Sequence, residues 1–287
     1  MKLKELPINA LVRDYADNTM FVVAAQDHPG YGGTTLITER LVGVGCLDAA
    51  EPRAKKKVIG HWDRVWDFGN NDYALSNIHQ WLNSTAQDWY VPAHEFDEPP
   101  VNALLHYKEF GYADRPGFLS RFSDTFRNAL LEVDVPVLQR KGPRLNGELG
   151  AVRAKVFLPS RTEIGKGDEL GIPEGKMFPV FYNLRMYKAK PTEADMQKYG
   201  RRWNPASPGN AEGSPHIYDP RVAWWFGLRT ANMQYRFMNR VMCSYGAVSY
   251  TYANNDIVGI RPVLNLSGEL EVAGDGGFDE IFTILKG

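Results

Sequence analysis

Short apolar segments separated by long loops recur along the whole chain, and this pattern is what most constrains its fold. The chain contains 27 Gly and 18 Pro, residues that end strands and helices and form turns. Such spacing is typical of short strands rather than of long helices. Phe21–Gln26 and Thr35–Thr38 therefore predict two strands joined by a turn in His28–Gly33, and Val156–Leu158 predicts a short strand that ends at Pro159.

Two other segments have the apolar spacing of helices. Ala74–Asn83 predicts one helix, with Asn71 or Asp72 as its N-cap, and Phe118–Leu131 predicts a second. Their apolar stripes are formed by Leu75, Ile78, Trp81 and Leu82 in the first helix, and by Leu119, Phe122, Phe126 and Leu130 in the second. Two main helices with many short strands and long loops predict an α+β fold.

We expect a single domain over residues 1–287, because no linker or low-complexity segment divides the chain. This domain would have an N-terminal strand extension and inserted loops. The polar segment 188–222, rich in Pro and Gly, predicts the longest of these loops. Within it, Thr192–Lys198 predicts one or two helical turns, because Thr192 and Asp195 have capping-box spacing.

Charge and hydropathy exclude several classes of partner. The net charge is −1 and the Lys and Arg residues are scattered, which argues against nucleic acid as a partner. No segment has the ~20 consecutive apolar residues that span a membrane, and the N-terminus lacks a signal-peptide pattern. We therefore expect synthesis in a cytoplasm without membrane insertion. Under these conditions Cys46 and Cys243 are expected to be buried thiols without a disulfide.

The sequence offers little catalytic chemistry, and we assign no catalytic residue. It has no nucleophile elbow, P-loop or zinc-protease motif. His61–Asp63 contains an imidazole that we interpret as structural, and no pair of carboxylates stands out for glycosidase chemistry. His94–Glu98 is the one cluster with metal-ligand chemistry. We interpret it as a solvated acidic loop, because no second ligand pair has a recognisable spacing, and we expect neither a metal ion nor a cofactor.

The composition changes in a segment at about residues 230–256. It is rich in Tyr, Asn, Ser and Arg and has no Lys or Glu, which resembles the composition of binding surfaces. We therefore predict a ligand-binding face here. Its candidate contact residues are Asn232, Gln234, Tyr235, Arg236, Tyr245, Ser249, Tyr250, Tyr252 and Asn254.

The same segment has the pattern of a β-hairpin. A tight turn at Tyr245–Gly246 separates two predicted strands, and alternation places Val248, Tyr250 and Tyr252 on one face. A second turn at Ala253–Asp256 leads into a strand over Val258–Leu266, where Pro262 indicates an edge position or a strand end. The alternative is that the tyrosine rings of this hairpin pack on the core and bind nothing.

Several motifs, taken in order over roughly residues 58–267, resemble a domain-of-unknown-function family common in gut bacteria and their phages. They are Tyr73–Asn83, Pro116–Ser123, Val156–Ser160 with Glu163–Gly165, Trp224–Trp225 with Leu228–Arg229, and Gly259–Leu264. The resemblance implies a C-type-lectin-like fold. Some members of that family are the variable proteins of diversity-generating retroelements, in which a reverse transcriptase rewrites adenine-derived codons near the C-terminus.

The resemblance also implies roles for particular residues. Variable positions would lie between the Trp224–Trp225 and Gly259–Pro262 anchors, with the two tryptophans in the core and Arg261 in a buried hydrogen bond or ion pair. The calcium motifs of sugar-binding C-type lectins are missing, because Glu98–Pro100 and Asn254–Asp256 are poor substitutes for them. A calcium-dependent lectin is therefore not expected.

These observations predict a non-enzymatic binding protein. The expected partner is a protein or glycan on a cell surface, and the expected setting is a phage or prophage receptor-binding protein carried on the virion. One alternative is a structural subunit whose Tyr-rich face contacts another copy of the chain or other phage structural proteins. A second alternative is an enzyme of the formylglycine-generating type, which would require Cys46 and Cys243 to meet.

Overall fold

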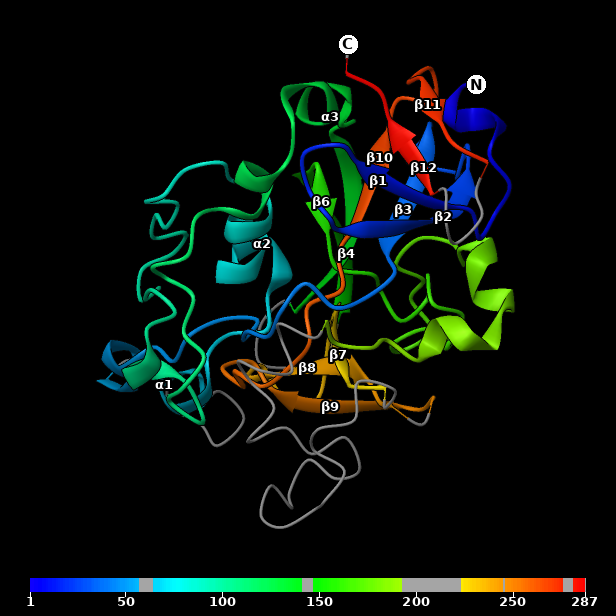
Figure 1. Cartoon of the computed structure of the whole chain (residues 1–287). Coiled ribbons are helices and arrows are strands. Elements are labelled where there is room, and N and C mark those ends of the chain that lie inside the picture. The colour runs from blue at the N-terminus through cyan, green and yellow to red at the C-terminus, as the bar shows by residue number, and fades with distance from the viewer. Residues whose placement is uncertain (57–63, 141–146, 193–222, 245, 276–280, 287) are drawn as a thin grey trace.

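The computed structural model of the protein describes residues 1–56, 64–140, 147–192, 223–244, 246–275 and 281–286. Within them, one large sheet, two small antiparallel sheets and several short helices form an α+β fold, as the sequence predicts (Figure 1). None of the helices in these residues combines the length and the apolar content that a bilayer span requires.

The large sheet has seven strands in the order β11-β12-β1-β2-β3-β10-β6. Its strands are β1 (Leu11–Asp14), β2 (Met20–Gln26), β3 (Thr34–Thr38), β6 (Val156–Phe157), β10 (Val263–Leu266), β11 (Val272–Ala273) and β12 (Phe282–Ile284). β1 pairs in parallel with β12, whereas its pairing with β2 is antiparallel. This pairing brings the first and last strands of the chain together, and both termini lie near that part of the sheet in Figure 1.

The hairpin of β2 and β3 confirms the first two predicted strands and the turn between them. Residues 23–25 and 35–36 carry a β-bulge, and the turn uses positive φ angles at Asp27 and Gly33. A Cβ atom at Gly33 would lie 2.4 Å from the carbonyl oxygen of Leu266, so only glycine fits beside β10. The strand predicted over Val258–Leu266 is shorter than expected, because β10 begins directly after Pro262. Pro262 therefore lies at a strand end, as one of the two predictions had it, and not in an edge strand, since β10 pairs with β3 and with β6.

Each of the two predicted helices is shorter than expected and broken in two. The first is divided into η4 (Tyr73–Leu75) and α2 (Asn77–Leu82), and the second into η6 (Phe118–Arg121) and α3 (Asp124–Ala129). The reason is a serine with extended backbone between the two parts. The Ser76 side chain accepts a hydrogen bond from the N–H of His79. The Ser123 side chain accepts one from the N–H of Phe126, so that each serine begins a new helix as its N-cap.

A second two-stranded sheet was not predicted from the sequence. β4 (Val133–Arg140) and β5 (Gly147–Ala154) form a long antiparallel hairpin. Pro136 in β4 and Gly150 in β5 obscure its pattern, because proline and glycine are usually signals against a strand interior. The other short helices within the described residues are η1 (Leu3–Glu5), η2 (Pro52–Lys56), α1 (Val65–Phe68), η5 (Asn102–Leu104), η7 (Pro179–Tyr182) and η8 (Leu184–Tyr187).

The third sheet contains the C-terminal segment singled out in the sequence. β7 (Phe226–Ala231), β8 (Met238–Met242) and β9 (Val248–Tyr252) pair in this order, and the sheet lies away from the large sheet in Figure 1. The predicted hairpin is confirmed, with Gly246 at a φ of 93° in the turn between β8 and β9. β7 connects this sheet to the core through its wholly buried residues.

The core confirms the roles expected for the anchor residues. Trp224 and Trp225 are buried, and the Arg261 guanidinium donates hydrogen bonds to the backbone oxygens of Thr38 and Met186. Burial lowers the pKa of Arg261 to about 10. Most of the predicted loop 188–222 lies outside the described residues. The predicted helical turns at Thr192–Lys198 lie outside them except for Thr192, and His61–Asp63 lies outside them entirely.

Candidate functional site

The predicted binding residues lie on two neighbouring parts of the third sheet. One part is the loop of residues 232–237, which joins β7 to β8, and the other is the strand β9 with the turn that follows it. Tyr245 lies outside the described residues. The structure separates the remaining candidates into residues that face solvent and residues that hold the backbone in place.

Asn71 holds the 232–237 loop from the inside. Its side-chain Nδ2 lies 3.1, 2.9 and 2.6 Å from the carbonyl oxygens of Asn232, Tyr235 and Met238, which share its two N–H groups. The backbone N–H of Asn71 also donates to the carbonyl oxygen of Arg236 at 2.9 Å. These bonds fix the loop backbone through a residue distant in sequence, so the backbone need not be ordered from a flexible state when a partner binds.

Asn232 and Asn254 are buried, which removes them from the set of solvent-facing candidates. The Asn232 Oδ1 accepts the N–H of Gln234 at 2.9 Å and so forms part of the loop turn. The Asn254 Nδ2 donates to the carbonyl oxygens of Asp67 and Leu104 at 3.1 and 3.3 Å. The many asparagines of this segment suggested contact residues. At these two positions, however, the side-chain amides are buried and form hydrogen bonds with backbone groups.

The side chains of Gln234, Tyr235 and Arg236 point outward from the held loop. Gln234 and Arg236 are exposed, and Tyr235 is half-buried. The Tyr235 ring lies 5.6 Å from Phe237, whose ring lies 6.2 Å from Tyr252 on β9. The loop and the strand thus share one continuous set of aromatic contacts.

The two faces of the β8–β9 hairpin differ in burial. Tyr250 pairs with Arg240 and Tyr252 pairs with Met238, so these residues share one face by strand alternation. Tyr250 is 50% exposed, and the Arg240 guanidinium lies 5.8 Å from its ring centroid. Ser249 pairs with the buried Val241 and lies on the opposite face, half-buried. Ser249 therefore does not share a face with the tyrosines, contrary to its grouping with them in the predicted contact set.

Arg240 is itself held in place by a buried carboxylate. Its Nε and an Nη atom donate to the two oxygens of Glu169 at 2.9 and 2.7 Å. Glu169 is buried and also accepts from Arg161 at 3.1 Å. Bidentate pairing of this kind fixes the plane of the guanidinium group, and it keeps Arg240 beside Tyr250.

Sequence reasoning missed two aromatic residues that extend this face. The Phe68 ring from α1 stacks on Tyr252, with centroids 4.0 Å apart and planes at 10°, and His106 lies 5.1 Å from the same tyrosine. Phe68 is half-buried and His106 is exposed. Phe68 ends α1 and His106 lies in a loop, both far in sequence from β9, so no local pattern indicated that they meet Tyr252. We call Gln234, Tyr235, Arg236, Tyr250, Tyr252, Phe68 and His106 the aromatic face.

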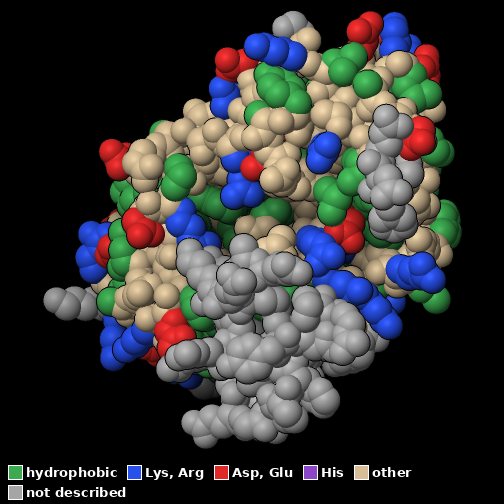
Figure 2. Space-filling model, in the orientation of Figure 1, with side chains coloured by type: hydrophobic (Ala, Val, Ile, Leu, Met, Phe, Trp, Pro, Cys, Tyr) green, Lys and Arg blue, Asp and Glu red, His purple; other side chains and the backbone are tan. Residues whose placement is uncertain are grey.

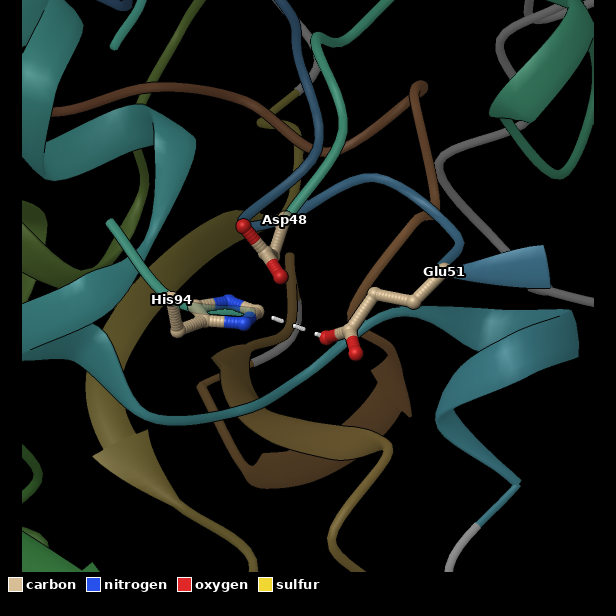
Figure 3. Close-up of side chains that lie close together, drawn as sticks. All are labelled: Asp48, Glu51 and His94. Carbon is tan, nitrogen blue, oxygen red and sulfur yellow. Dashed lines mark ion pairs between the residues drawn. The ribbon is translucent and has the colours of Figure 1, made fainter. Parts of the chain in front are cut away.

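A second group of polar side chains lies where the sequence suggested a solvated acidic loop. His94 is half-buried and faces Asp48 and Glu51, both of which are buried (Figure 3). Asp97, from the same segment as His94, is also buried and accepts hydrogen bonds from Asn77 and from the N–H of Ala93. The interpretation as a solvated loop is therefore wrong, because tertiary contacts enclose two of its polar residues.

Burial dominates the protonation of this second group. It raises the pKa of Glu51 to about 7, and the positive charge of Arg236 opposes that shift. Burial, with the negative charges of Asp97 and Glu51, raises the pKa of Asp48 well above its usual value. For His94, burial lowers the pKa while the charge of Asp97 raises it. The group thus concentrates carboxylates in a place where their charges are costly.

The cysteines do not have the surroundings of reactive thiols. Cys46 and Cys243 are buried and no disulfide joins them, as the sequence predicts. Burial raises the pKa of Cys46 well above its usual value, and the charges of Asp48 and Asp256 raise it further. A thiol with a raised pKa is a poor nucleophile because its thiolate is scarce.

One family model matches the chain, that of the "Domain of unknown function (DUF6273)", over residues 32–268. The chain belongs to this family. No curated protein and no solved structure shows a significant match to it. The matched region of this DUF6273 member contains the aromatic face and the Asp48–Glu51–His94 group, but not β1, β2, β11 or β12.

Proposed function

We propose that this DUF6273 protein is a non-enzymatic binding protein whose partner contacts the aromatic face. The observation that carries the proposal is the set of hydrogen bonds from the Asn71 side chain to the 232–237 loop and Met238. These bonds fix the backbone beneath the outward-facing side chains of Gln234, Tyr235 and Arg236. A fixed loop beside exposed Tyr250 lowers the entropy cost of binding, and tyrosine and arginine contribute strongly to binding energy.

The partner that best fits this face is a protein or a glycan on a cell surface. Aromatic rings and amide groups together suit the apolar patches and hydroxyl groups of both. The described part of the surface in Figure 2 mixes basic and acidic side chains, which favours such partners over nucleic acid. The raised pKa of Cys46 likewise favours a binding role over thiol chemistry.

The C-type-lectin-like architecture and the phage setting are part of the same proposal. Paired terminal strands, such as β1 and β12, and a small separate sheet that carries the C-terminal segment support the lectin-like architecture. We further propose that any codon diversification is confined to outward-facing positions, since Asn232 and Asn254 hold the loops. Sequencing of the gene from a population, with its template repeat, would test this: adenine-directed changes should spare these two codons.

The binding proposal is tested with fluorescently labelled protein and a panel of intact gut bacterial cells. The Arg236→Ala/Tyr250→Ala double variant should lose more than about tenfold in affinity for cells that the unaltered protein binds. Its melting temperature should change little, because both side chains are exposed. Tyr182→Ala is the matched control, because Tyr182 is 80% exposed but lies on η7.

The outcomes separate the proposal from its structural alternative. Unchanged cell binding by the double variant, or an equal loss in the Tyr182→Ala control, would contradict a binding role for the aromatic face. If the double variant instead converts an oligomer to a monomer in light scattering, the face is a contact between copies of the chain.

A further inference from the structure

The group formed by Asp48, Glu51 and His94 has the arrangement of metal ligands. One ligand atom of each residue lies within 4.8 Å of the others, and among the described residues this is the group found with such geometry. Asp48 and Glu51 come from one segment, and His94 comes from a segment more than forty positions away (Figure 3). The side chains converge on a common point instead of facing solvent.

Two ligand atoms in this group lack hydrogen-bond partners. Glu51 is 3% exposed and its Oε1 is buried without a partner, as is the Nε2 of His94. These two atoms face each other at 3.8 Å, which is too long for a hydrogen bond, and they form the ion pair drawn in Figure 3 only when the imidazole is protonated. Buried polar atoms are almost always satisfied, so the two open atoms indicate a ligand that fits between them.

The third ligand is already oriented by its surroundings. The Oδ1 of Asp48 accepts the backbone N–H of Asn77 at 3.0 Å, and its Oδ2 accepts that of Asn70 at 3.2 Å. Each oxygen keeps a second lone pair for another partner. Asn77 is held in turn by Asp97 at 3.0 Å. Outer hydrogen bonds of this kind commonly orient the carboxylates that bind metal ions.

Local charge also favours a cation at this place. The carboxylates of Asp48, Glu51 and Asp97 are all buried close enough to one another to interact electrostatically. The exposed Arg236 acts on Glu51 only through its charge, and Arg53 pairs with Glu98 instead. A divalent cation would stabilise the charged form of these carboxylates, for which the described side chains supply little positive charge.

We infer that Asp48, Glu51 and His94 bind one divalent transition-metal ion of the Zn²⁺ type. One imidazole with two carboxylates suits Zn²⁺ and its neighbours, whereas Ca²⁺ and Mg²⁺ prefer six or more oxygen ligands. Tetrahedral bonds of about 2.0 Å place ligand atoms about 3.3 Å apart, so a small movement of the Glu51 or His94 side chain completes the site. Three protein ligands leave one position for water or another ligand.

The test uses the full-length protein, freed of metal with a chelator and titrated with ZnCl₂ by calorimetry. One ion per chain should bind, and the melting temperature should rise with the Zn²⁺ concentration. CoCl₂ should produce the visible absorption bands of tetrahedral Co²⁺. CaCl₂ and MgCl₂ should bind at least tenfold more weakly than ZnCl₂.

The Glu51→Gln variant separates a metal site from a purely structural cluster. It removes a buried negative charge, so the metal-free variant should melt at or above the temperature of the metal-free unaltered protein. It should nevertheless lose the Zn²⁺-dependent rise, and His94→Gln should weaken Zn²⁺ binding more than about 100-fold. The matched controls are Glu98→Gln, a carboxylate paired with Arg53, and His106→Gln, an exposed imidazole on the aromatic face.

Several results would overturn the inference. The first is that the folded unaltered protein binds neither Zn²⁺ nor Co²⁺ at millimolar metal concentration. The second is that His94→Gln binds Zn²⁺ as tightly as the unaltered protein does. The third is that the unaltered protein binds Ca²⁺ more tightly than Zn²⁺. If Glu51→Gln does not fold, the Co²⁺ spectrum of the unaltered protein and the Zn²⁺ titration of His94→Gln still show whether the three residues bind a metal ion. The outcome of this metal titration does not depend on the proposed binding function, because no cell-surface partner takes part in it.

Discussion

At the scale of single residues, Arg229 and Glu163 form an ion pair in the interior. Both side chains are fully buried, and the two guanidinium–carboxylate distances are 2.5 and 2.8 Å. Arg229 also donates to the backbone oxygens of Pro136 and Leu158 at 2.9 Å each. One arginine therefore links β7 to β4 and to the segment directly after β6, which come from distant parts of the chain.

Glu163→Gln should destabilise the protein strongly, because it leaves the Arg229 charge buried without its counter-ion. The expected loss is about 3–5 kcal/mol in the free energy of unfolding, measured with urea. Glu132→Gln is the matched control. It breaks an exposed pair with Arg153 and should cost less than about 1 kcal/mol. Equal losses in the two variants would contradict a central role for the buried pair.

His79 makes the stability of the fold depend on pH. Burial lowers its pKa from 6.5 to about 4, and its Nδ1 lies 3.3 Å from the Nδ2 of Asn83. Because the unfolded chain binds this proton more readily, the neutral imidazole stabilises the fold fully above pH 6.5. That contribution, about 3 kcal/mol, is lost as the pH falls from 6.5 to 4.

The matched measurement compares the unaltered protein with His79→Gln over this pH range. The difference in the free energy of unfolding between the two proteins should shrink as the pH falls. His106→Gln removes an exposed imidazole whose pKa is lowered by burial and raised by the charge of Asp256, and it should change the pH profile less than His79→Gln does. A constant difference between the unaltered protein and His79→Gln would show that the imidazole is protonated equally in both states.

At the scale of elements, the loop between β7 and β8 depends on a side chain from outside the third sheet. Asn71→Asp keeps the size of the side chain but replaces the donor Nδ2 with an oxygen that faces three carbonyl groups. We expect a loss of about 2–4 kcal/mol and faster hydrogen exchange in residues 232–238. Asn128→Asp on the exposed side of α3 is the control. Unchanged exchange in the loop would mean that Asn71 does not hold it.

The helices show how far periodicity reaches as a predictor of elements. The apolar spacing located buried residues in both segments, such as Ile78, Trp81 and Phe126, whereas Leu75 of the first stripe is only half-buried. It did not reveal the breaks at Ser76 and Ser123, because a serine within an amphipathic pattern is compatible with both a helix interior and an N-cap. The break at Ser123 is decided by Asp14 of β1, which accepts hydrogen bonds from the Ser123 N–H and hydroxyl at 2.6 and 2.7 Å.

At the scale of the whole molecule, the family match and the folding unit do not coincide. The match begins after β2 and ends before β11, whereas the hydrophobic core extends from Leu3 to Ile284. The Phe21 ring of β2 stacks on Phe126 of α3, with centroids 5.6 Å apart. Strands outside the match therefore cover core residues inside it.

A fragment of residues 32–268 should consequently not fold as a stable unit. Without β2, the β3 edge and the Phe126 ring would be exposed. We expect broad, weakly cooperative thermal unfolding and strong binding of an apolar dye, compared with a single sharp transition for the full-length chain. A fragment that unfolds as sharply as the full-length chain, at a similar temperature, would contradict this.

The buried roles of Trp224 and Arg261 were implied by the family resemblance. The sequence pattern by itself determined the α+β class and the β2–β3 and β8–β9 hairpins. These follow from alternation, turn chemistry and apolar content, which act over a few neighbouring residues. The same local reasoning located the outward-facing Tyr250. It could not distinguish Gln234, which faces solvent, from Asn232, which is buried in the turn beside it.

Only the tertiary structure decided which polar residues belong to the interior. Asn71 reaches the 232–237 loop, and His94 reaches Glu51, across gaps in the sequence that no periodic pattern spans. The physical reason is that a buried amide or carboxylate takes its role from the backbone groups and charges around it, and these come from distant segments. An asparagine or a histidine in such a chain therefore has no fixed role until the fold has supplied its neighbours.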